Sequence, residues 1–400
     1  MAAEHQAGGF REVQQGLTGA GVRVALFTNN YLPFCGGGTI SVETLRHGLE
    51  ARGHETWVFA PRFGDAPEAG PRVVRYASIP AATYPEFALA IPCSRRVAAR
   101  VAALDPDVFH AHHPFLLGPA ARRFARRRRR PLVFTYHTRY DKYAHYVPLL
   151  SRALVEAAAV RLSSRFAAGA DAVLAPSALV AEELRARGVR VPIAVVPTGV
   201  DCERFRPGDA AEARRALGLP VDDPLVLYVG RLDPEKSVER VLRAFDRVAG
   251  TVRDARLAVV GHGTQARRLA QLARGLAASG RIHFLGARAH DALTPCYQAA
   301  ELFLFASETE TQGLVLAEAA ACGIPAVAVN APGSDEVVGD GATGVLTKSS
   351  PTALADAAIG LLLDAERRRA MGVRARARAE REFDVRLQIE RTLAVYESLR

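Results

Sequence analysis

Two carboxylates stand eight positions apart in the stretch SETETQGLVLAEAAACGIPAV, which spans residues 307–327. Glu310 lies in a polar segment, and Glu318 lies in an alanine-rich run that predicts a helix. Two explanations are open for Glu318: the helix dipole favours an acid there by ~0.3–1 kcal/mol, or its oxygens accept two vicinal hydroxyls such as those of a ribose. Glu310 could then hold a second sugar. The free amides at the start of this helix can bind oxyanions or sugar oxygens, and they belong to Gly313, Leu314 and Val315.

Two cations follow a predicted strand in GRLDPEKSVERVLRAF. Arg231 ends the strand, and Lys236 stands just before a predicted helix. Two cations beside a helix N-terminus at the carboxyl end of a strand indicate a diphosphate site rather than a surface salt-bridge pair. Paired carboxylates alone would also suggest glycoside hydrolysis. A hydrolase of neutral sugars has no need of a diphosphate site, so the cations argue against it.

A run of three glycines lies between a predicted strand and a predicted helix in NNYLPFCGGGTIS. Gly37 and Gly38 could expose backbone amides to a phosphate or sugar oxygen at the helix N-terminus. A tight turn that needs positive φ explains them equally well.

A histidine and a cluster of tyrosines follow another strand in FTYHTRYDKYAHYVPLL. His137 falls at the predicted strand end, where it faces the ligand edge of the sheet or serves as a core histidine. The density of tyrosines in one loop predicts a lined acceptor pocket, and its members are Tyr136, Tyr140, Tyr143 and Tyr146.

The sequence predicts no metal site. His110 and His112 share one face of a strand but lack nearby acidic partners at helical spacing. Asp105 and Asp107 precede a strand, away from its ligand end, so they are not interpreted as a DxD metal motif. The five cysteines are scattered without a CxxC pair, which indicates a reducing compartment.

These groups need a scaffold that brings strand ends together. Apolar runs without alternation predict parallel strands at 22–28, 55–60, 107–113, 131–137, 171–176 and 193–199, and again at 225–231, 256–263, 282–287, 302–307 and 325–330. Helical stretches separate most of them. Two doubly wound α/β domains that face one another across a cleft are therefore expected, and the 400 residues suit two domains. The predicted organisation is a tail at 1–20, domains at 21–205 and 206–385, and a final helix at 386–400.

Positive charge is concentrated in the first half of the chain. Residues 1–205 hold 26 Lys and Arg against 17 Asp and Glu, an excess of nine out of the total +10. Seven arginines lie within 122–130. A solvated turn explains this run as well as contact with an anionic membrane does. No signal peptide or apolar span is evident, so a cytoplasmic protein is expected, peripheral at the inner face of the membrane.

The set GGG, FTYHT, VVPTGVD, GRLDPEK and ETQGLVLAEAAACGIPAVA resembles glycosyltransferase family 4, retaining enzymes of the GT-B fold, over residues 20–399. The stretch ETQGLVLAE resembles the family's E-x7-E motif. The resemblance implies a nucleotide diphosphate sugar as co-substrate and no metal. One departure is GHGT at 261–264, where the family often has an acid after the first glycine, so contacts of His262 with the base stay open.

The resemblance also implies individual roles. Glu318 would hold the donor's ribose and Glu310 the transferred sugar, with His137 beside that sugar. Arg231 and Lys236 would grip the diphosphate. Backbone amides would come from Gly313, Leu314 and Val315, and Gly37 and Gly38 would let the first domain close on the donor.

A narrower similarity joins NNYLPFCGGGTISVETLRHGLE, TYHTRYDKYAHYVP and ETQGLV to diacylglycerol α-glucosyltransferases. The expected activity is therefore transfer of a hexose from a UDP- or GDP-sugar to a hydroxyl, on a membrane lipid such as diacylglycerol and not on nucleic acid. The alternatives are a soluble sugar or secondary-metabolite acceptor, a nucleotide-sugar epimerase and a non-catalytic binding protein.

Overall fold

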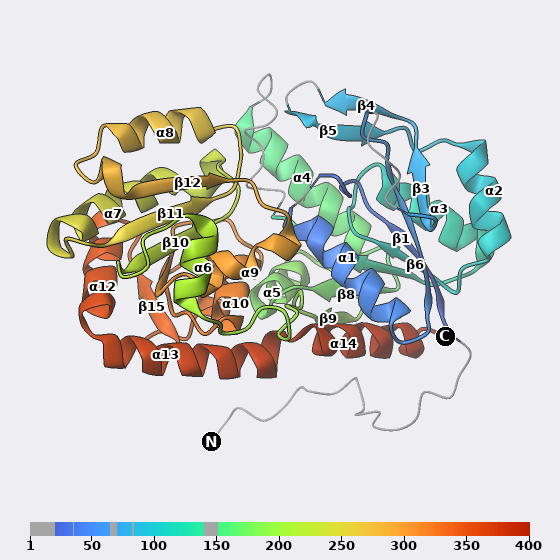
Figure 1. The fold of residues 1–400 in the computed structure, drawn as a ribbon. Coiled ribbons are helices and arrows are strands. Elements are labelled where there is room, and N and C mark those ends of the chain that lie inside the picture. Colours follow the sequence, from blue (N-terminus) through green and yellow to red (C-terminus); the bar gives the residue numbers. More distant parts are fainter. Residues whose placement is uncertain (1–20, 35, 65–69, 82–83, 140–150) are drawn as a thin grey trace.

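The computed structural model describes residues 21–34, 36–64, 70–81, 84–139 and 151–400, which form two α/β domains (Figure 1). Each domain is built on a parallel sheet whose central strands are buried and apolar. Strands of this kind need helices on both faces. The predicted pair of Rossmann-like domains is confirmed, and each of the eleven strands expected from the sequence is present.

The first domain holds a seven-stranded sheet in the order β3-β2-β1-β6-β7-β8-β9. The winding reverses between β1 and β6, and in such sheets ligands bind outside the carboxyl ends of the strands at this point. The strands are β1 (Arg23–Phe27), β2 (Glu55–Pro61), β3 (Val73–Tyr76), β6 (Val108–Ala111), β7 (Leu132–Thr135), β8 (Ala172–Ala175) and β9 (Ile193–Val195).

Helices cover both faces of this sheet, and an antiparallel hairpin stands apart from it (Figure 1). The hairpin consists of β4 (Ser78–Ala81) and β5 (Tyr84–Ala90). The helices are α1 (Gly37–Glu50), α2 (Arg95–Leu104), α3 (Leu117–Arg128), α4 (Arg152–Ala167) and α5 (Ala178–Ala186).

The second domain repeats the design with a six-stranded sheet in the order β12-β11-β10-β13-β14-β15. Its winding reverses between β10 and β13. The strands are β10 (Leu225–Val229), β11 (Arg256–Val260), β12 (Ile282–Gly286), β13 (Leu302–Phe305), β14 (Ala326–Val329) and β15 (Gly344–Thr347).

The helices of the second domain include several single turns. The α-helices are α6 (Ala210–Leu217), α7 (Val238–Thr251), α8 (Ala266–Arg274), α9 (Thr294–Gln298), α10 (Leu314–Ala321), α11 (Ser334–Val337), α12 (Pro351–Leu363) and α13 (Ala365–Arg378). The shorter helical turns are η2 (Pro234–Lys236), η3 (Ser279–Arg281), η4 (His290–Ala292) and η5 (Ala379–Phe383).

The final helix, α14 (Val385–Ser398), returns to the first domain (Figure 1). Its Ile389, Leu393 and Tyr396 are buried in the core of that domain. The chain therefore crosses between the domains twice, and the two crossings are hydrogen-bonded: Val200 N to Phe383 O at 2.7 Å, and Val385 N to Val200 O at 2.9 Å. The first crossing enters the second domain's core already at Val200, ahead of the boundary expected at residue 205. No helix in the described part of the chain is long and apolar enough to cross a membrane.

Candidate active site

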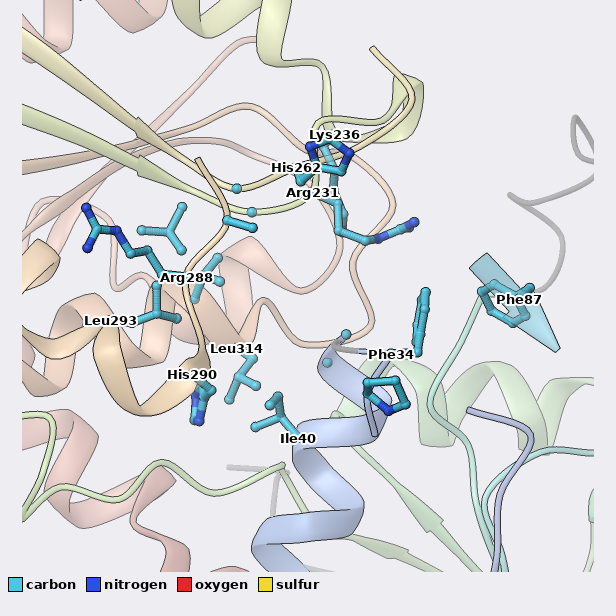
Figure 2. Close-up of a pocket in the computed structure, with 18 of the residues that line it drawn as sticks. Phe34, Ile40, Phe87, Arg231, Lys236, His262, Arg288, His290, Leu293 and Leu314 are labelled. Carbon is cyan, nitrogen blue, oxygen red and sulfur yellow. The ribbon is translucent and has the colours of Figure 1, made fainter. Parts of the chain in front are cut away.

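Two adjoining cavities, of about 720 and 520 Å³, lie between the carboxyl edges of the two sheets. We call the larger one the donor-side cavity and the smaller one the acceptor-side cavity. Arg231, Lys236 and Glu310 line both, so the cavities meet at these three side chains. Figure 2 shows residues of both domains around the donor-side cavity, with Phe34, Ile40 and Phe87 from the first domain and Arg231, His290 and Leu314 from the second.

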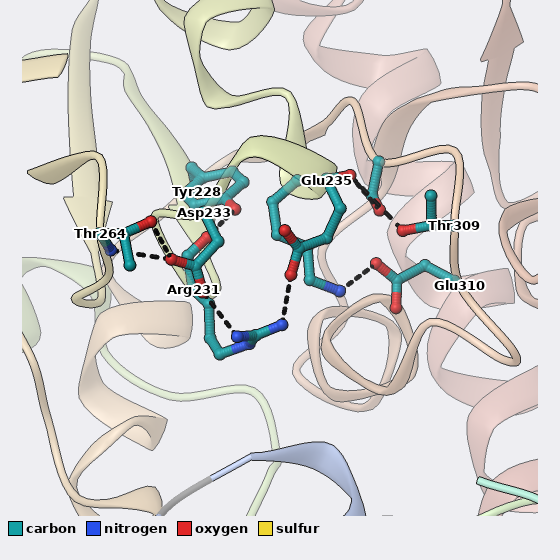
Figure 3. Close-up of polar contacts among 9 residues, drawn as sticks. Tyr228, Arg231, Asp233, Glu235, Thr264, Thr309 and Glu310 are labelled. Atoms are coloured by element: carbon teal, nitrogen blue, oxygen red, sulfur yellow. Dashed lines mark hydrogen bonds and ion pairs between the residues drawn. The ribbon is translucent and has the colours of Figure 1, made fainter. Parts of the chain in front are cut away.

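The cations and the first glutamate come together at the winding reversal of the second sheet. Arg231 follows β10, Lys236 closes the turn η2, and Glu310 lies in the loop after β13. Lys236 Nζ donates to Glu310 Oε1 at 2.6 Å (Figure 3). Burial alone would raise the pKa of Glu310, but the charge and hydrogen bond of Lys236, together with Ser307 and Arg231, outweigh it and lower that pKa below its ordinary value. Glu310 is therefore held as a carboxylate within the cleft.

Arg231 is engaged by two acids that the sequence analysis did not single out. Its guanidinium donates to Asp233 at 2.5 Å and also to Glu235, and both carboxylates are almost fully buried (Figure 3). Asp233 in turn accepts hydrogen bonds from the amide and hydroxyl of Thr264, at 2.8 and 2.7 Å. Two buried acceptors fix the orientation of the guanidinium, so that Arg231 meets a ligand from a preset position.

Glu318 lies 2% exposed on α10, at the wall of the donor-side cavity. Its Oε1 accepts from His290 Nε2 at 2.8 Å, and its Oε2 accepts from the Tyr297 hydroxyl at 2.6 Å. Arg204 Nη2 lies 2.9 Å from His290 Nδ1. Since a guanidinium can only donate, Nδ1 must accept, and the ring proton is on Nε2 facing Glu318. His290 and Tyr297 therefore orient the carboxylate and leave lone pairs on each oxygen for a ligand.

The helix behind this carboxylate begins at the predicted place. Gly313, with φ 77°, precedes α10 in the left-handed region, and a side chain on it would come within 3.0 Å of Leu316 Cδ1. Leu314 and Val315 line the donor-side cavity. Gly230 and Gly261 also line the donor-side cavity with backbone alone. They pack so closely that a Cβ on Gly261 would lie 1.9 Å from Gly230 O. His262, which follows, is exposed on the same wall.

Gly37 and Gly38 open α1 on the opposite side of the cleft, and both line the acceptor-side cavity. Neither adopts positive φ, so the turn explanation does not account for them. A Cβ on Gly37 would meet nothing within 4 Å, and one on Gly38 would only reach His137 Cβ at 4.0 Å. The space in front of these glycines is open to a ligand.

His137 lines the acceptor-side cavity at the carboxyl end of β7, and its Nε2 lies 2.8 Å from His112 Nδ1. His110 stacks on His112 and contacts Thr135 and Tyr396 at 2.7 and 2.6 Å. Burial lowers the pKa of His137 to about 4 and contributes most to lowering that of His110 to about 3. These imidazoles are therefore uncharged at neutral pH. The described residues contain no group of three or more His, Cys, Asp or Glu side chains arranged to hold a metal.

Of the four tyrosines expected to line an acceptor pocket, the structure describes only Tyr136. Tyr140, Tyr143 and Tyr146 lie outside the described residues. The prediction for Tyr136 is wrong: its ring is 1% exposed and packs edge-on against Phe134, in the core of the first domain. The alternation of side chains along the strand turns Tyr136 away from the cavity that His137 lines.

The arginine run ends α3 at the edge of the sheet opposite the cleft. Arg128 and Arg130 pair with Asp105, which caps α2 just before β6. Arg126, Arg127 and Arg129 are exposed. A helix of 12 residues is about 18 Å long, so the C-terminal end of the run, near Arg128, is separated from the carboxyl edge of the sheet by about that length.

Comparison with known proteins agrees with this architecture. Residues 35–204 match the model of glycosyltransferase family 4, and residues 209–378 match that of glycosyl transferases group 1. An alpha-monoglucosyldiacylglycerol synthase from Streptococcus pneumoniae is 30% identical over 81% of this chain and 75% of its own. A GDP-mannose-dependent alpha-mannosyltransferase from Mycobacterium tuberculosis is 34% identical over 82% of this chain and 84% of its own.

Among solved structures, sucrose-phosphate synthase from Thermosynechococcus elongatus aligns with a TM-score of 0.79 and 25% identity over 94% of this chain and 99% of its own. HepE of Anabaena, solved with UDP-glucose, has the same fold, with a TM-score of 0.77 and 22% identity over 94% and 100%. The chain belongs to glycosyltransferase family 4 and is a glycosyltransferase of the GT-B fold.

Proposed function

We propose that this glycosyltransferase moves a hexose, with retention of configuration and without a metal, from a nucleotide diphosphate sugar to a hydroxyl of a membrane lipid such as diacylglycerol. The observation that carries the proposal is the contact between Lys236 and Glu310 where the two cavities meet. This contact supports the proposal because a cation suited to a leaving diphosphate and a carboxylate suited to a sugar lie at one point of the cleft.

We assign the ribose, the diphosphate and the hexose of the donor to residues of the second domain. Glu318 receives the ribose hydroxyls, while Arg231, Lys236 and the first amides of α10 neutralise the diphosphate. Glu310 holds the hexose next to His137, which stays neutral and offers a hydrogen bond. A fixed arrangement of donors around the developing negative charge stabilises the transition state more than the ground state.

Retention is supported by the absence of a suitable base among the described residues of the acceptor-side cavity. Inversion needs a base on the face opposite the leaving group. Glu310 is the one carboxylate in that described lining, and Lys236 engages it. His113 and His137 have pKa values lowered chiefly by burial to about 3 and about 4, so they are weak bases. The acceptor hydroxyl then gives its proton to the departing phosphate oxygen, as the C1–phosphate bond breaks and the new C1–O bond forms on the same face.

A lipid acceptor is supported by apolar side chains at the mouth of the cleft. Ile79 and Leu89, on the β4–β5 hairpin, are 56% and 40% exposed and line the donor-side and acceptor-side cavities respectively. Phe34 and Phe87 form an edge-to-face pair between these cavities, with ring centroids 4.8 Å apart. The relatives named alpha-monoglucosyldiacylglycerol synthases favour the same acceptor class.

Transfer to dioleoylglycerol in mixed micelles tests the proposed function. UDP-glucose and GDP-mannose are each supplied with EDTA present, and the product is examined by proton NMR. We expect an α-linked glycolipid from one donor and no loss of rate with EDTA, because protein groups alone neutralise the diphosphate. A β-linked product contradicts retention, and activity that returns only with Mg²⁺ or Mn²⁺ contradicts metal independence. Conversion of the donor sugar without acceptor indicates an epimerase instead.

We also expect reversible binding to vesicles that contain anionic lipid, weakened by salt, as flotation measures it. Because the hairpin lies at the cleft, replacing Ile79 and Leu89 by serine is expected to abolish most of the binding. Replacing Arg126 to Arg130 by serine is expected to reduce it only at low salt, because these charges stand about 18 Å from the cleft edge and attraction decays within about 10 Å.

Donor binding serves as the control for the arginine variant, because Arg126 to Arg130 line neither cavity. For the hairpin, Leu89→Ser alone is the matched control, because Leu89 lines only the acceptor-side cavity whereas Ile79 lines the donor-side cavity. A wild-type protein that ignores anionic vesicles at low salt would remove the membrane claim. A soluble acceptor would then be the better interpretation.

A further inference from the structure

A buried guanidinium in the wall of the acceptor-side cavity has hydrogen-bonding capacity that the protein itself does not use. Arg139 lies two residues beyond His137, in the segment that follows β7, and it lines the cavity that His137 and Glu310 also line. The residue is only 9% exposed. Arginine is almost never buried to this degree unless its charge is matched.

The protein supplies only part of that match. Arg139 Nη2 donates to Glu183 Oε1 at 2.7 Å. Nε and Nη1 are both buried and have no hydrogen-bond partner among the residues that the structure describes. A buried N–H without an acceptor destabilises the folded protein, so two such groups in the wall of a cavity indicate that a ligand supplies the acceptor.

Charge balance points the same way. Glu183 also accepts from Arg187 Nη2 at 3.2 Å, so one carboxylate serves two guanidinium groups. The trio carries a net charge of +1 next to the cavity. The one carboxylate in the described lining of the acceptor-side cavity, Glu310, is engaged by Lys236. The cavity therefore presents a cation that shares its one counterion, Glu183, with Arg187.

A second group in the same wall lacks a partner. Asn30 Oδ1 is buried and accepts no hydrogen bond within the described part of the chain, while its Nδ2 lies 3.5 Å from His113 Nε2. An amide oxygen of this kind accepts from a hydroxyl, and the open N–H groups of a guanidinium donate to an oxyanion. The cavity therefore suits a molecule that carries both a hydroxyl and an oxyanion.

We propose that Arg139 binds a phosphate or carboxylate group of the sugar acceptor, so that the acceptor is a polyol bearing an anionic group close to its reactive hydroxyl. The open Nε–H and Nη1–H groups of the guanidinium can each donate to an oxygen of such a group. This inference rests on the proposed transferase function and narrows it: the anion belongs to a phospholipid headgroup or to a soluble phosphorylated polyol, and a neutral diacylglycerol leaves Arg139 unmatched.

Paired acceptors test this directly. Transfer from the accepted donor is measured to dioleoylphosphatidylglycerol against dioleoylglycerol in matched micelles, and to glycerol 3-phosphate against glycerol in solution. We expect the anionic member of one pair to be preferred in kcat/KM by roughly tenfold or more, and the pair that shows it identifies the source of the anion. Arg139→Gln should erase the preference by lowering kcat/KM for the anionic member roughly tenfold or more.

Two further variants separate binding from folding. Arg126→Gln removes an equal charge from the same domain at an exposed helical position, and it should keep the preference. The double variant Arg139→Gln with Glu183→Gln keeps the net charge of the trio at +1. It should behave like Arg139→Gln, with its affinity for the nucleotide donor intact. Equal use of charged and neutral acceptors by the wild type, or equal losses in Arg139→Gln and Arg126→Gln, would overturn the proposal.

Calorimetric titration with glycerol 3-phosphate and with inorganic phosphate gives a readout without turnover. Wild-type binding that Arg139→Gln weakens by roughly tenfold supports the anion site even if no sugar is transferred, in which case the transferase proposal fails alone. Binding that is absent, or identical in the two proteins, counts against the anion site whatever the outcome for transfer.

Discussion

Replacement of Lys236 with alanine is expected to lower kcat/KM for the donor by roughly a hundredfold, which is the usual effect of removing one group that stabilises developing negative charge. The variant loses a cation from the point where the cavities meet. It also leaves Glu310 without its 2.6 Å partner, so that a carboxylate faces the departing diphosphate. Steady-state kinetics over a range of pH measures both effects.

The pH dependence of kcat/KM reports the direction in which the pKa of Glu310 changes. In the wild type, Lys236, Ser307 and Arg231 together outweigh burial and keep the pKa of Glu310 below its ordinary value, so the carboxylate persists down to acidic pH. Without Lys236, the largest of these pKa-lowering contributions is lost and the pKa rises, which moves the acidic limb of the profile to higher pH. Arg243→Ala removes an exposed charge from the neighbouring helix α7 and should change kcat/KM by less than about twofold. Equal losses in Lys236→Ala and Arg243→Ala would refute this assignment of Lys236.

Gly333→Ala is expected to impair the enzyme from a position that touches no substrate. A Cβ on Gly333 would stand 2.7 Å from Glu310 Cβ and 2.9 Å from Gln312 N, so the catalytic loop must shift. We expect a loss of roughly 1–3 kcal/mol in the free energy of unfolding and a fall in kcat/KM of tenfold or more, because small misplacements of positioned groups slow reactions strongly. Thermal unfolding and initial rates measure the two quantities.

Gly341→Ala is the matched control for Gly333→Ala. Gly341 also has a positive φ, 68° against 81°, but its Cβ would meet nothing within 4 Å. The control variant therefore carries only the strain of a positive φ, and it should keep kcat/KM within about twofold. If both variants lose activity equally, the contact between Gly333 and the Glu310 loop does not matter.

The sheets could be predicted because their central strands are buried on both faces, as in LVLYV and LFLF, where every residue is apolar or aromatic and enclosed. The hairpin of β4 and β5 was missed because its prolines and mixed polarity give no strand pattern. The strands β3 and β15, VVRY and GVLT, were missed because they lie at sheet edges and are only half buried, so neither gives a continuous apolar run. The carboxyl edge of each sheet then fixed where Arg231, Lys236 and Glu310 must gather.

The partners of these site residues could not be predicted, since they depend on packing between distant segments. Asp233 and Glu235 stand in the same motif as Arg231, and their acidity was the available signal. His290 is 28 positions from Glu318, and nothing in the spacing links them. Tyr136 and His137 are neighbours, so their side chains project from opposite sides of the backbone. An error of one residue in the predicted register exchanges the side chain that faces the cavity with the one that faces the core.

The paired crossings have a mechanical consequence. Val200 bonds to both Phe383 and Val385, so the two connecting segments leave the domains at one shared point rather than at opposite ends of the cleft. Gln312, in the same loop as Glu310, is tied to this point as well, with its side chain bonded to both backbone groups of Thr198. Neighbouring crossings of this kind act as one hinge, about which the two domains rotate. We expect opening for product and closing on donor to be the same rotation in opposite directions, with the loop of Glu310 held at the hinge by Gln312.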